Sequence, residues 1–120
     1  SLYQNIDIDT LTHLVIATFG YFFDDAYNVM FRKLLTISQF ENEKARKIYI
    51  SLYREYPIRF QSKIFAMLMQ DGEFREEDPI IVASEFYALP YMLIHTCDSL
   101  KEAAPMLKEH VRQFVRNYHV

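Results

Sequence analysis

Hydrophobic residues along this chain recur mostly three and four positions apart, which is the period of an amphipathic α-helix. Six stretches follow this pattern, and they predict helices at about residues 9–22, 25–37, 39–56, 58–70, 79–98 and 99–118. Only two Gly and four Pro interrupt the 120 residues. We therefore expect an all-α fold of about six helices that forms a single domain over residues 1–120.

Three positions carry clear signals for helix ends. Asp78 followed by Pro79 suits a helix start, because the Asp side chain accepts from free N–H groups and Pro fits the first turn. Gly72 predicts a left-handed residue at the end of the fourth helix. Pro57 is expected to break or kink the chain between the third and fourth helices, because it lacks an N–H and its ring crowds the preceding turn.

Two stretches, Ser38-Gln39-Phe40-Glu41 and Ser99-Leu100-Lys101-Glu102, have the spacing of capping boxes. Pro105 leaves two alternatives open for the last helix. Either Ser99 caps a helix that is kinked at residue 105, or a turn at 99–103 precedes a helix with Pro105 near its first position.

The periodicity also predicts which side of a helix is buried. In helix 25–37 the expected exposed residues are Arg32 and Lys33, and the expected buried residues are Val29, Met30, Leu34 and Ile37. In helix 58–70 the expected buried residues are Phe60, Ile64, Met67 and Leu68.

Helix 79–98 is apolar on two faces, whereas a helix of a small domain usually buries one stripe. One face carries Val82, Phe86, Leu89, Leu93 and Cys97, and the other carries Ile80, Ala83, Tyr87, Tyr91 and Ile94. We expect one face to meet the core of the domain and the other to meet a partner. The sequence does not decide which face is which.

The last helix has a seam of apolar residues with the spacing of helices that pack at a shallow angle. Together the two last helices predict a self-complementary patch that a twofold axis can bury in a homodimer. The predicted interface residues are Val82, Phe86, Leu89, Leu93, Leu107, Val111, Phe114 and Tyr118. The alternative is that both seams are buried inside the monomer.

Composition excludes several classes of protein. The net charge is −3 and no basic cluster is present, which argues against nucleic-acid binding by this chain itself. The single Cys excludes an internal disulfide and, without a recognisable signal peptide or membrane-spanning stretch, predicts a soluble cytoplasmic protein. The chain begins at Ser1 rather than Met, which is compatible with a fragment of a longer protein.

No catalytic or metal-binding pattern stands out. The four His residues lack the spacing of helical metal ligands, and Cys97 lies two residues from His95, on a different side of a helix. We therefore expect no enzyme, no metal and no cofactor.

Aromatic side chains suggest a different kind of site. Tyr has an apolar body and a hydroxyl that needs a partner when it is buried, and small-molecule cavities combine such groups. Pro90 leaves the carbonyl of Phe86 without its helical partner, which favours an opening on the inner face. The predicted ligand-binding residues are Thr18, Phe22, Tyr49, Tyr53, Tyr87 and Tyr91. The alternative is that these aromatics fill the core.

Several stretches resemble one family, the TetR-type transcriptional regulators. They are FRKLLTISQF at 31–40, QDGEF at 70–74, residues 78–98 with Phe-Tyr-Ala-x-Pro at 86–90, and LKEHVRQFVRNYHV at 107–120. The resemblance covers the chain from about Leu11 and implies the C-terminal effector-binding and dimerisation domain of such a regulator. In that family the last two long helices pair with those of a second subunit in a four-helix bundle.

The resemblance implies a ligand-sensing domain of a bacterial repressor. A hydrophobic or aromatic small molecule would change the DNA affinity of an N-terminal helix-turn-helix that is absent from this sequence. The expected partners are a second copy of the chain, the effector, and DNA through the missing part only, with no membrane. The alternative is a helical protein-interaction or dimerisation module without a small-molecule ligand.

Overall fold

A computed structural model describes residues 8–120 of the chain. Helices make up 84% of this part, which contains no strand. They are α1 (Ile8–Asp24), α2 (Ala26–Ser38), α3 (Glu43–Ile50), the π-helical turn η1 (Ser51–Glu55), α4 (Tyr56–Gln70), α5 (Pro79–Thr96) and α6 (Leu100–Tyr118). The all-α prediction is confirmed, and no helix in these residues is long and apolar enough to cross a membrane. The sequence also predicts Asp7 or Asp9 as a cap of the first helix; Asp9 lies in the first turn of α1, and Asp7 lies outside the described residues.

The elements α3, η1 and α4 form one uninterrupted helix over residues 43–70, so the described chain has five separate helices rather than six. Of the break or kink expected at Pro57, the break was wrong, because the helix continues through this residue. The N–H of Tyr56 donates to the carbonyl of Ser51, five residues earlier, and this wide turn lies directly before Pro57. Because a proline ring crowds the carbonyl four residues back, here that of Tyr53, the wider turn accommodates it without ending the helix.

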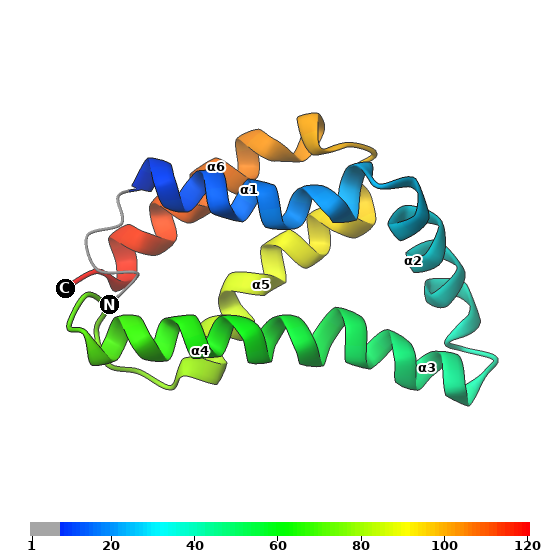
Figure 1. The fold of residues 1–120 in the computed structure, drawn as a ribbon, viewed down its shortest axis with the longest axis horizontal. Helices are drawn as coiled ribbons and strands as arrows, with labels where there is room; N and C mark the ends of the chain where they lie inside the picture. Colours follow the sequence, from blue (N-terminus) through cyan, green and yellow to red (C-terminus); the bar gives the residue numbers. More distant parts are fainter. Residues whose placement is uncertain (1–7) are drawn as a thin grey trace.

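The helices form two packed pairs that α2 joins at one end (Figure 1). α1 packs along α6 at one edge of the molecule, and α4 packs along α5 at the other. α5 runs from α4 toward the far end of α1 and also contacts α6. α2 connects the end of α1 to the start of α3.

Most of both apolar faces of α5 is covered within the single chain by α4, α6 and α1, although Ile80 is 59% exposed. Its buried residues are Val82, Ala83, Phe86, Tyr87, Pro90, Leu93 and Ile94. Six residues of the predicted dimer interface therefore belong to the monomer core: Val82, Phe86, Leu93, Leu107, Val111 and Phe114. The other two, Leu89 and Tyr118, are half-buried against this core.

Two predicted helix ends are confirmed and one is corrected. Asp78 accepts from the N–H of Ile80 at 2.9 Å, directly before Pro79, and Gly72 has φ +78°. The start of α3 differs, because Asn42 caps it by accepting from Ala45, four residues beyond the expected start.

The first alternative for the last helix holds, since α6 begins after Ser99 and continues through Pro105. Ser99 accepts from the N–H of Glu102, and the Glu102 side chain accepts from the N–H of Asp98. This reciprocal arrangement is close to a capping box.

Two helices bury a side that differs at least in part from the one predicted, although Leu68 on α4 is buried as expected. α2 buries Arg32 and Leu35 and leaves Met30, Leu34 and Ile37 exposed, because it lies at the end of the molecule and its inner side faces α1 and α3. α4 buries Gln61, Phe65 and Leu68, whereas Phe60 is 61% exposed. The predicted stripe of this helix contained only apolar residues and therefore left out Gln61, a polar residue that the packing buries.

Candidate functional site

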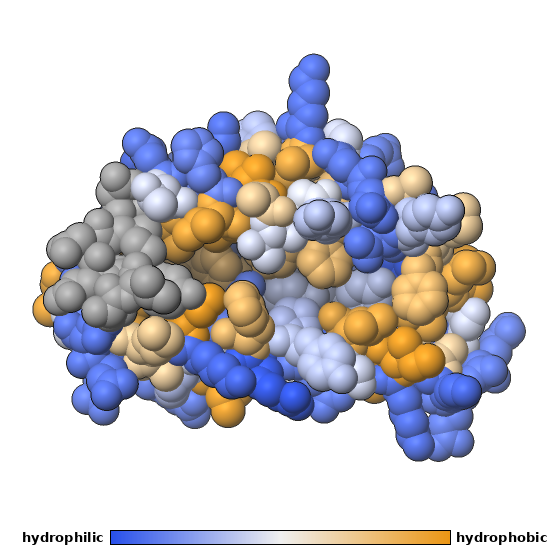
Figure 2. All heavy atoms as spheres, viewed as in Figure 1, coloured by the Kyte–Doolittle hydropathy of each residue, from blue (hydrophilic) through white to orange (hydrophobic). Residues whose placement is uncertain are grey.

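An apolar groove of about 170 Å³ lies between α1 and α4, with α5 and α6 as its floor. Figure 2 views this region, where apolar side chains line a recess between α1 above and α4 below. Its lining includes Leu14, Thr18, Phe60, Gln61, Ile64, Phe86 and Phe114.

The groove results from the pairing of the helices. α1 is held along α6 and α4 is held along α5, so the sides of α1 and α4 that face each other do not close together. Phe86 and Phe114 meet edge to face at 4.9 Å between ring centroids and form the floor. An apolar cavity of about 150 Å³ can hold one aromatic ring the size of benzene, so this groove has room for a small apolar group.

One polar group in the groove wall lacks a partner. Gln61 is 9% exposed, and its Oε1 has no hydrogen-bond donor among the described residues. The Thr18 hydroxyl, by contrast, donates to the carbonyl of Leu14 at 2.8 Å. Leaving a buried acceptor unsatisfied costs about 1–3 kcal/mol. A ligand that donates a hydrogen bond to Gln61 would therefore gain binding free energy beyond that of its apolar contacts.

The six predicted ligand-binding residues separate into two groups. Thr18 lines the groove. Tyr87 belongs to the main core, where its ring stacks on Phe19 at 6.3 Å and its hydroxyl has no partner among the described residues. The other four, Phe22, Tyr49, Tyr53 and Tyr91, come together at the α2 end of the molecule, in a cluster with Leu35. We call this group the aromatic cluster.

A closed set of hydrogen bonds joins the aromatic cluster to His95 on α5. The hydroxyls of Tyr49 and Tyr91 are hydrogen-bonded, and the Tyr49 hydroxyl lies 2.9 Å from Nε2 of His95. Nδ1 of His95 lies 2.9 Å from the carbonyl of Tyr91. Since a carbonyl only accepts, we assign the proton to Nδ1, so that Nε2 accepts from Tyr49 and Tyr49 accepts from Tyr91.

Burial keeps these groups uncharged near neutral pH. It lowers the pKa of His95, and the nearby charge of Arg32 lowers it further, although the hydrogen bond to the Tyr91 carbonyl acts in the opposite direction. Burial also raises the pKa of the Tyr49 phenol well above its usual value, with a further contribution from the hydrogen bond to Tyr91. Tyr49 and His95 are therefore neutral, and the nearby guanidinium of Arg32 carries a charge.

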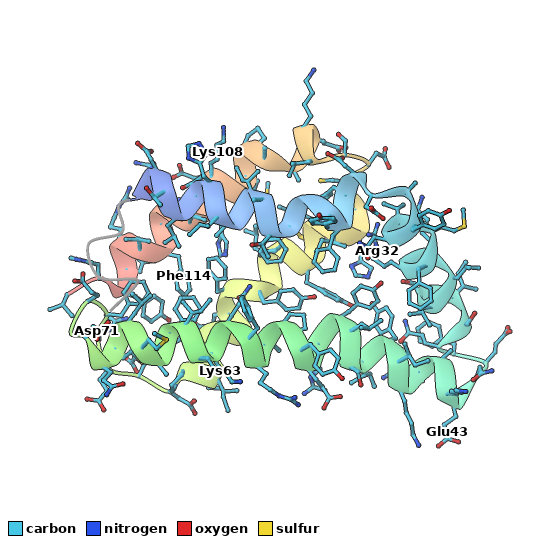
Figure 3. The ribbon with its side chains drawn as sticks, in the orientation of Figure 1. Arg32, Glu43, Lys63, Asp71, Lys108 and Phe114 are labelled. Atoms are coloured by element: carbon cyan, nitrogen blue, oxygen red, sulfur yellow. The ribbon has the colours of Figure 1, made fainter. Side chains whose placement is uncertain are left out.

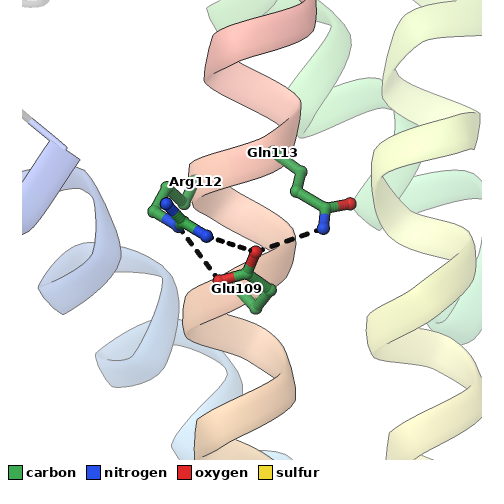
Figure 4. Close-up of polar contacts among 3 residues, drawn as sticks. All are labelled: Glu109, Arg112 and Gln113. Atoms are coloured by element: carbon green, nitrogen blue, oxygen red, sulfur yellow. Dashed lines mark hydrogen bonds and ion pairs between the residues drawn. The ribbon is translucent and has the colours of Figure 1, made fainter.

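A second and more open hollow lies between the loop before α5 and α6, and its polar groups already pair with one another. Its lining includes Arg75, Glu85, His110, Gln113 and Tyr118. The Tyr118 hydroxyl donates to Glu85 at 2.5 Å. Gln113 donates to Glu109, which also accepts two bonds from Arg112, at 2.7 and 3.0 Å (Figure 4). The groove is the better candidate site because its Gln61 oxygen is unpaired.

Sequence reasoning missed three residues that shape these sites: Arg32, Gln61 and His110. Gln61 gives no signal in a search for apolar stripes, because its side chain is polar. His110 donates from Nε2 to the carbonyl of Phe86 at 2.8 Å. The carbonyl that Pro90 deprives of its helical partner is therefore satisfied by α6.

No group of three or more His, Cys, Asp or Glu side chains within residues 8–120 is placed to hold a metal ion. No protein-family model matches the chain, and neither the curated proteins nor the solved structures compared with it include a match.

Proposed function

We propose that this chain is the ligand-sensing and dimerisation domain of a TetR-like transcriptional regulator, and that it binds a hydrophobic or aromatic small molecule. The groove between α1 and α4 carries the proposal, because it combines apolar walls with the unpaired Oε1 of Gln61. Small-molecule sites typically have this composition. The likeness of several stretches to that family, noted above, supports the same function.

A ligand in the groove would act by changing the separation of the two helix pairs. Because α1 packs along α6 and α4 packs along α5, a wedge between α1 and α4 would change the angle between the pairs. A ligand shifts such an equilibrium only as far as it binds one arrangement more tightly than the other. The DNA-binding part of the regulator would respond to this angle.

The outward side of α5 is the surface we propose for a second copy of the chain. Ile81 and Met92 are exposed there, with Ala88 between them on the same stripe. The outward side of α6 is more polar, as the Glu109 and Arg112 pair illustrates. An apolar α5 stripe beside a charged α6 surface suits an interface with an apolar centre and a polar rim.

The ligand-binding part is tested with neutral hydrophobic compounds that carry a hydrogen-bond donor, such as naphthol. We expect saturable binding by calorimetry and a rise in melting temperature. Ile64→Trp fills the groove and should abolish binding, whereas Ile48→Trp, on the exposed side of α3, should leave it intact. Equal binding by both variants would contradict the groove as the site.

The dimer is tested by light scattering with Met92→Lys, which should give a monomer if the outward stripe of α5 is the interface. Ile37→Lys, on the exposed side of α2, is the matched control and should not change the mass. A wild-type monomer at all accessible concentrations would contradict the dimer.

One observation favours a second function, a docking module for another protein. α2 presents an apolar outer side formed by Tyr27, Met30, Phe31, Leu34 and Ile37, all at least 48% exposed. Apolar side chains gather over this end of the molecule in Figure 2. If no small hydrophobic compound stabilises the chain while Leu34→Lys removes binding to a partner protein, the docking function is supported instead.

A further inference from the structure

Arg32 is a buried cation that has no anionic partner within residues 8–120. Its side chain lies on the inner side of α2, facing the molecule, and the residue is 5% exposed (Figure 3). Nη1 donates to the carbonyl of Phe22 at 2.5 Å, so Arg32 satisfies one of the free carbonyls at the end of α1. This bond uses one of the five N–H donors of the guanidinium.

The groups around Arg32 are aromatic and neutral. Tyr49 and Tyr53 lie close enough to interact electrostatically with its charge, and so does His95. Burial lowers the pKa of Arg32, but a guanidinium keeps its proton in proteins. An ionised group taken out of water is costly unless it is paired, so an anion supplied from outside would be stabilised at this position.

Phe22 on α1 connects the Arg32 position to the groove between α1 and α4. Thr18 in the groove wall is one helical turn before Phe22 on α1, and Phe19, which also lines the groove, packs against Phe22 with ring centroids 6.1 Å apart. Phe22 and Tyr53 meet edge to face with their ring centroids 6.3 Å apart. The carbonyl of Phe22 accepts from Arg32, so a ligand in the groove that displaces the Phe22 ring would come within reach of the guanidinium.

We propose that Arg32 binds the carboxylate of an amphipathic monocarboxylic acid whose apolar tail lies in the groove between α1 and α4. This inference rests on the proposed ligand-binding function and specifies the chemical class of the ligand. A planar guanidinium pairs with a carboxylate through two parallel hydrogen bonds. One unpaired cation balances one negative charge, which favours a monocarboxylate over a phosphate ester.

The test compares octanoic acid with octanol, which has the same tail and no charge, by calorimetry at pH 7.5 with the full chain. We expect octanoate to bind the wild type at least about tenfold more tightly than octanol, as a charge-assisted hydrogen bond would give. Arg32→Gln should remove this preference and leave octanol binding unchanged. Arg32→Lys should keep part of it, and Arg54→Gln, at an exposed position on η1, should keep all of it.

A second measurement on the wild type does not depend on the folding of any variant. The carboxyl pKa of bound, carbon-13-labelled octanoate should be lower than that of the free acid, because the guanidinium favours the ionised form. Equal affinity for octanoate and octanol, or an unchanged carboxyl pKa, would overturn the Arg32 inference and leave the groove function standing. Absence of binding by either compound, together with failure of naphthol, would overturn both.

Discussion

Nε2 of His110 lies 2.8 Å from the carbonyl oxygen of Phe86, the one carbonyl in the middle of α5 that Pro90 leaves without a helical partner. The two rings also stack, with centroids 4.8 Å apart. A histidine on α6 thus replaces the missing backbone donor of α5. The same contact fixes the neighbouring ring of Phe114, which lies 4.9 Å from Phe86 and forms the floor of the groove.

His110→Phe should lower the free energy of unfolding by about 1–3 kcal/mol, because it keeps a stacked ring but leaves the Phe86 carbonyl buried and unpaired. Urea denaturation measures the change. In a Pro90→Ala background the alanine N–H can donate to this carbonyl. His110→Phe should then lower the free energy of unfolding by a smaller amount. Equal costs in both backgrounds would show that the hydrogen bond contributes nothing.

Tyr49→Phe should destabilise the chain by about 1–3 kcal/mol, because it leaves both the Tyr91 hydroxyl and Nε2 of His95 without their partner. Tyr27→Phe is the matched control. Tyr27 is 86% exposed, so its change should stay within about 0.5 kcal/mol. Similar effects of the two substitutions would contradict the closed set of hydrogen bonds described here.

Stability should fall as the pH drops below about 6.5, through His95 and His110. Burial lowers the pKa of both imidazoles below 6.5, so the unfolded chain binds protons in this range more readily than the folded chain. The free energy of unfolding then rises with pH through this window. Above it, the contribution of the two neutral histidines to stability is complete. Unfolding in urea between pH 5 and 8 should show a shallower slope for His95→Gln, and an unchanged slope would contradict the assignment.

Gly72→Ala should cost about 1 kcal/mol, because Gly72 has φ +78° at the end of α4 and a side chain is strained there. Gly20→Ala provides the comparison. Gly20 lies inside α1, where Ala is favoured by about 1 kcal/mol, and an added Cβ would lie 3.3 Å from the flexible tip of Leu100. We expect this variant to be at least as stable as the wild type by thermal denaturation.

The helices themselves were largely predictable, because their start and end signals are local. The caps at Asp78 and Ser99 and the left-handed Gly72 depend on bonds to residues within a few positions. Pro57 was misjudged because its outcome depends on how the turn before it adjusts. A π turn keeps the helix continuous, and the hydrophobic periodicity of the sequence does not predict such a turn.

The candidate site was predictable only in part. An excess of buried tyrosines pointed to the aromatic cluster, and the structure brings four of the six predicted residues together there. The open space lies elsewhere, beside Thr18 and Gln61, because a groove is a gap between two helix pairs and has no residue signature of its own. Arg32 was expected to be exposed, since a lone cation on a helix usually is.

The sequence by itself determined the class of the fold, most helix boundaries and the apolar character of both faces of α5, since these follow from propensity, capping and periodicity along one chain. Only the tertiary structure decided what covers those faces, and it placed α4, α6 and α1 there. It also decided that the Arg32 side chain is buried and that His110 donates a hydrogen bond to the Phe86 carbonyl. These outcomes depend on contacts between residues far apart in the chain, where the geometry of packing rather than local preference selects the partner.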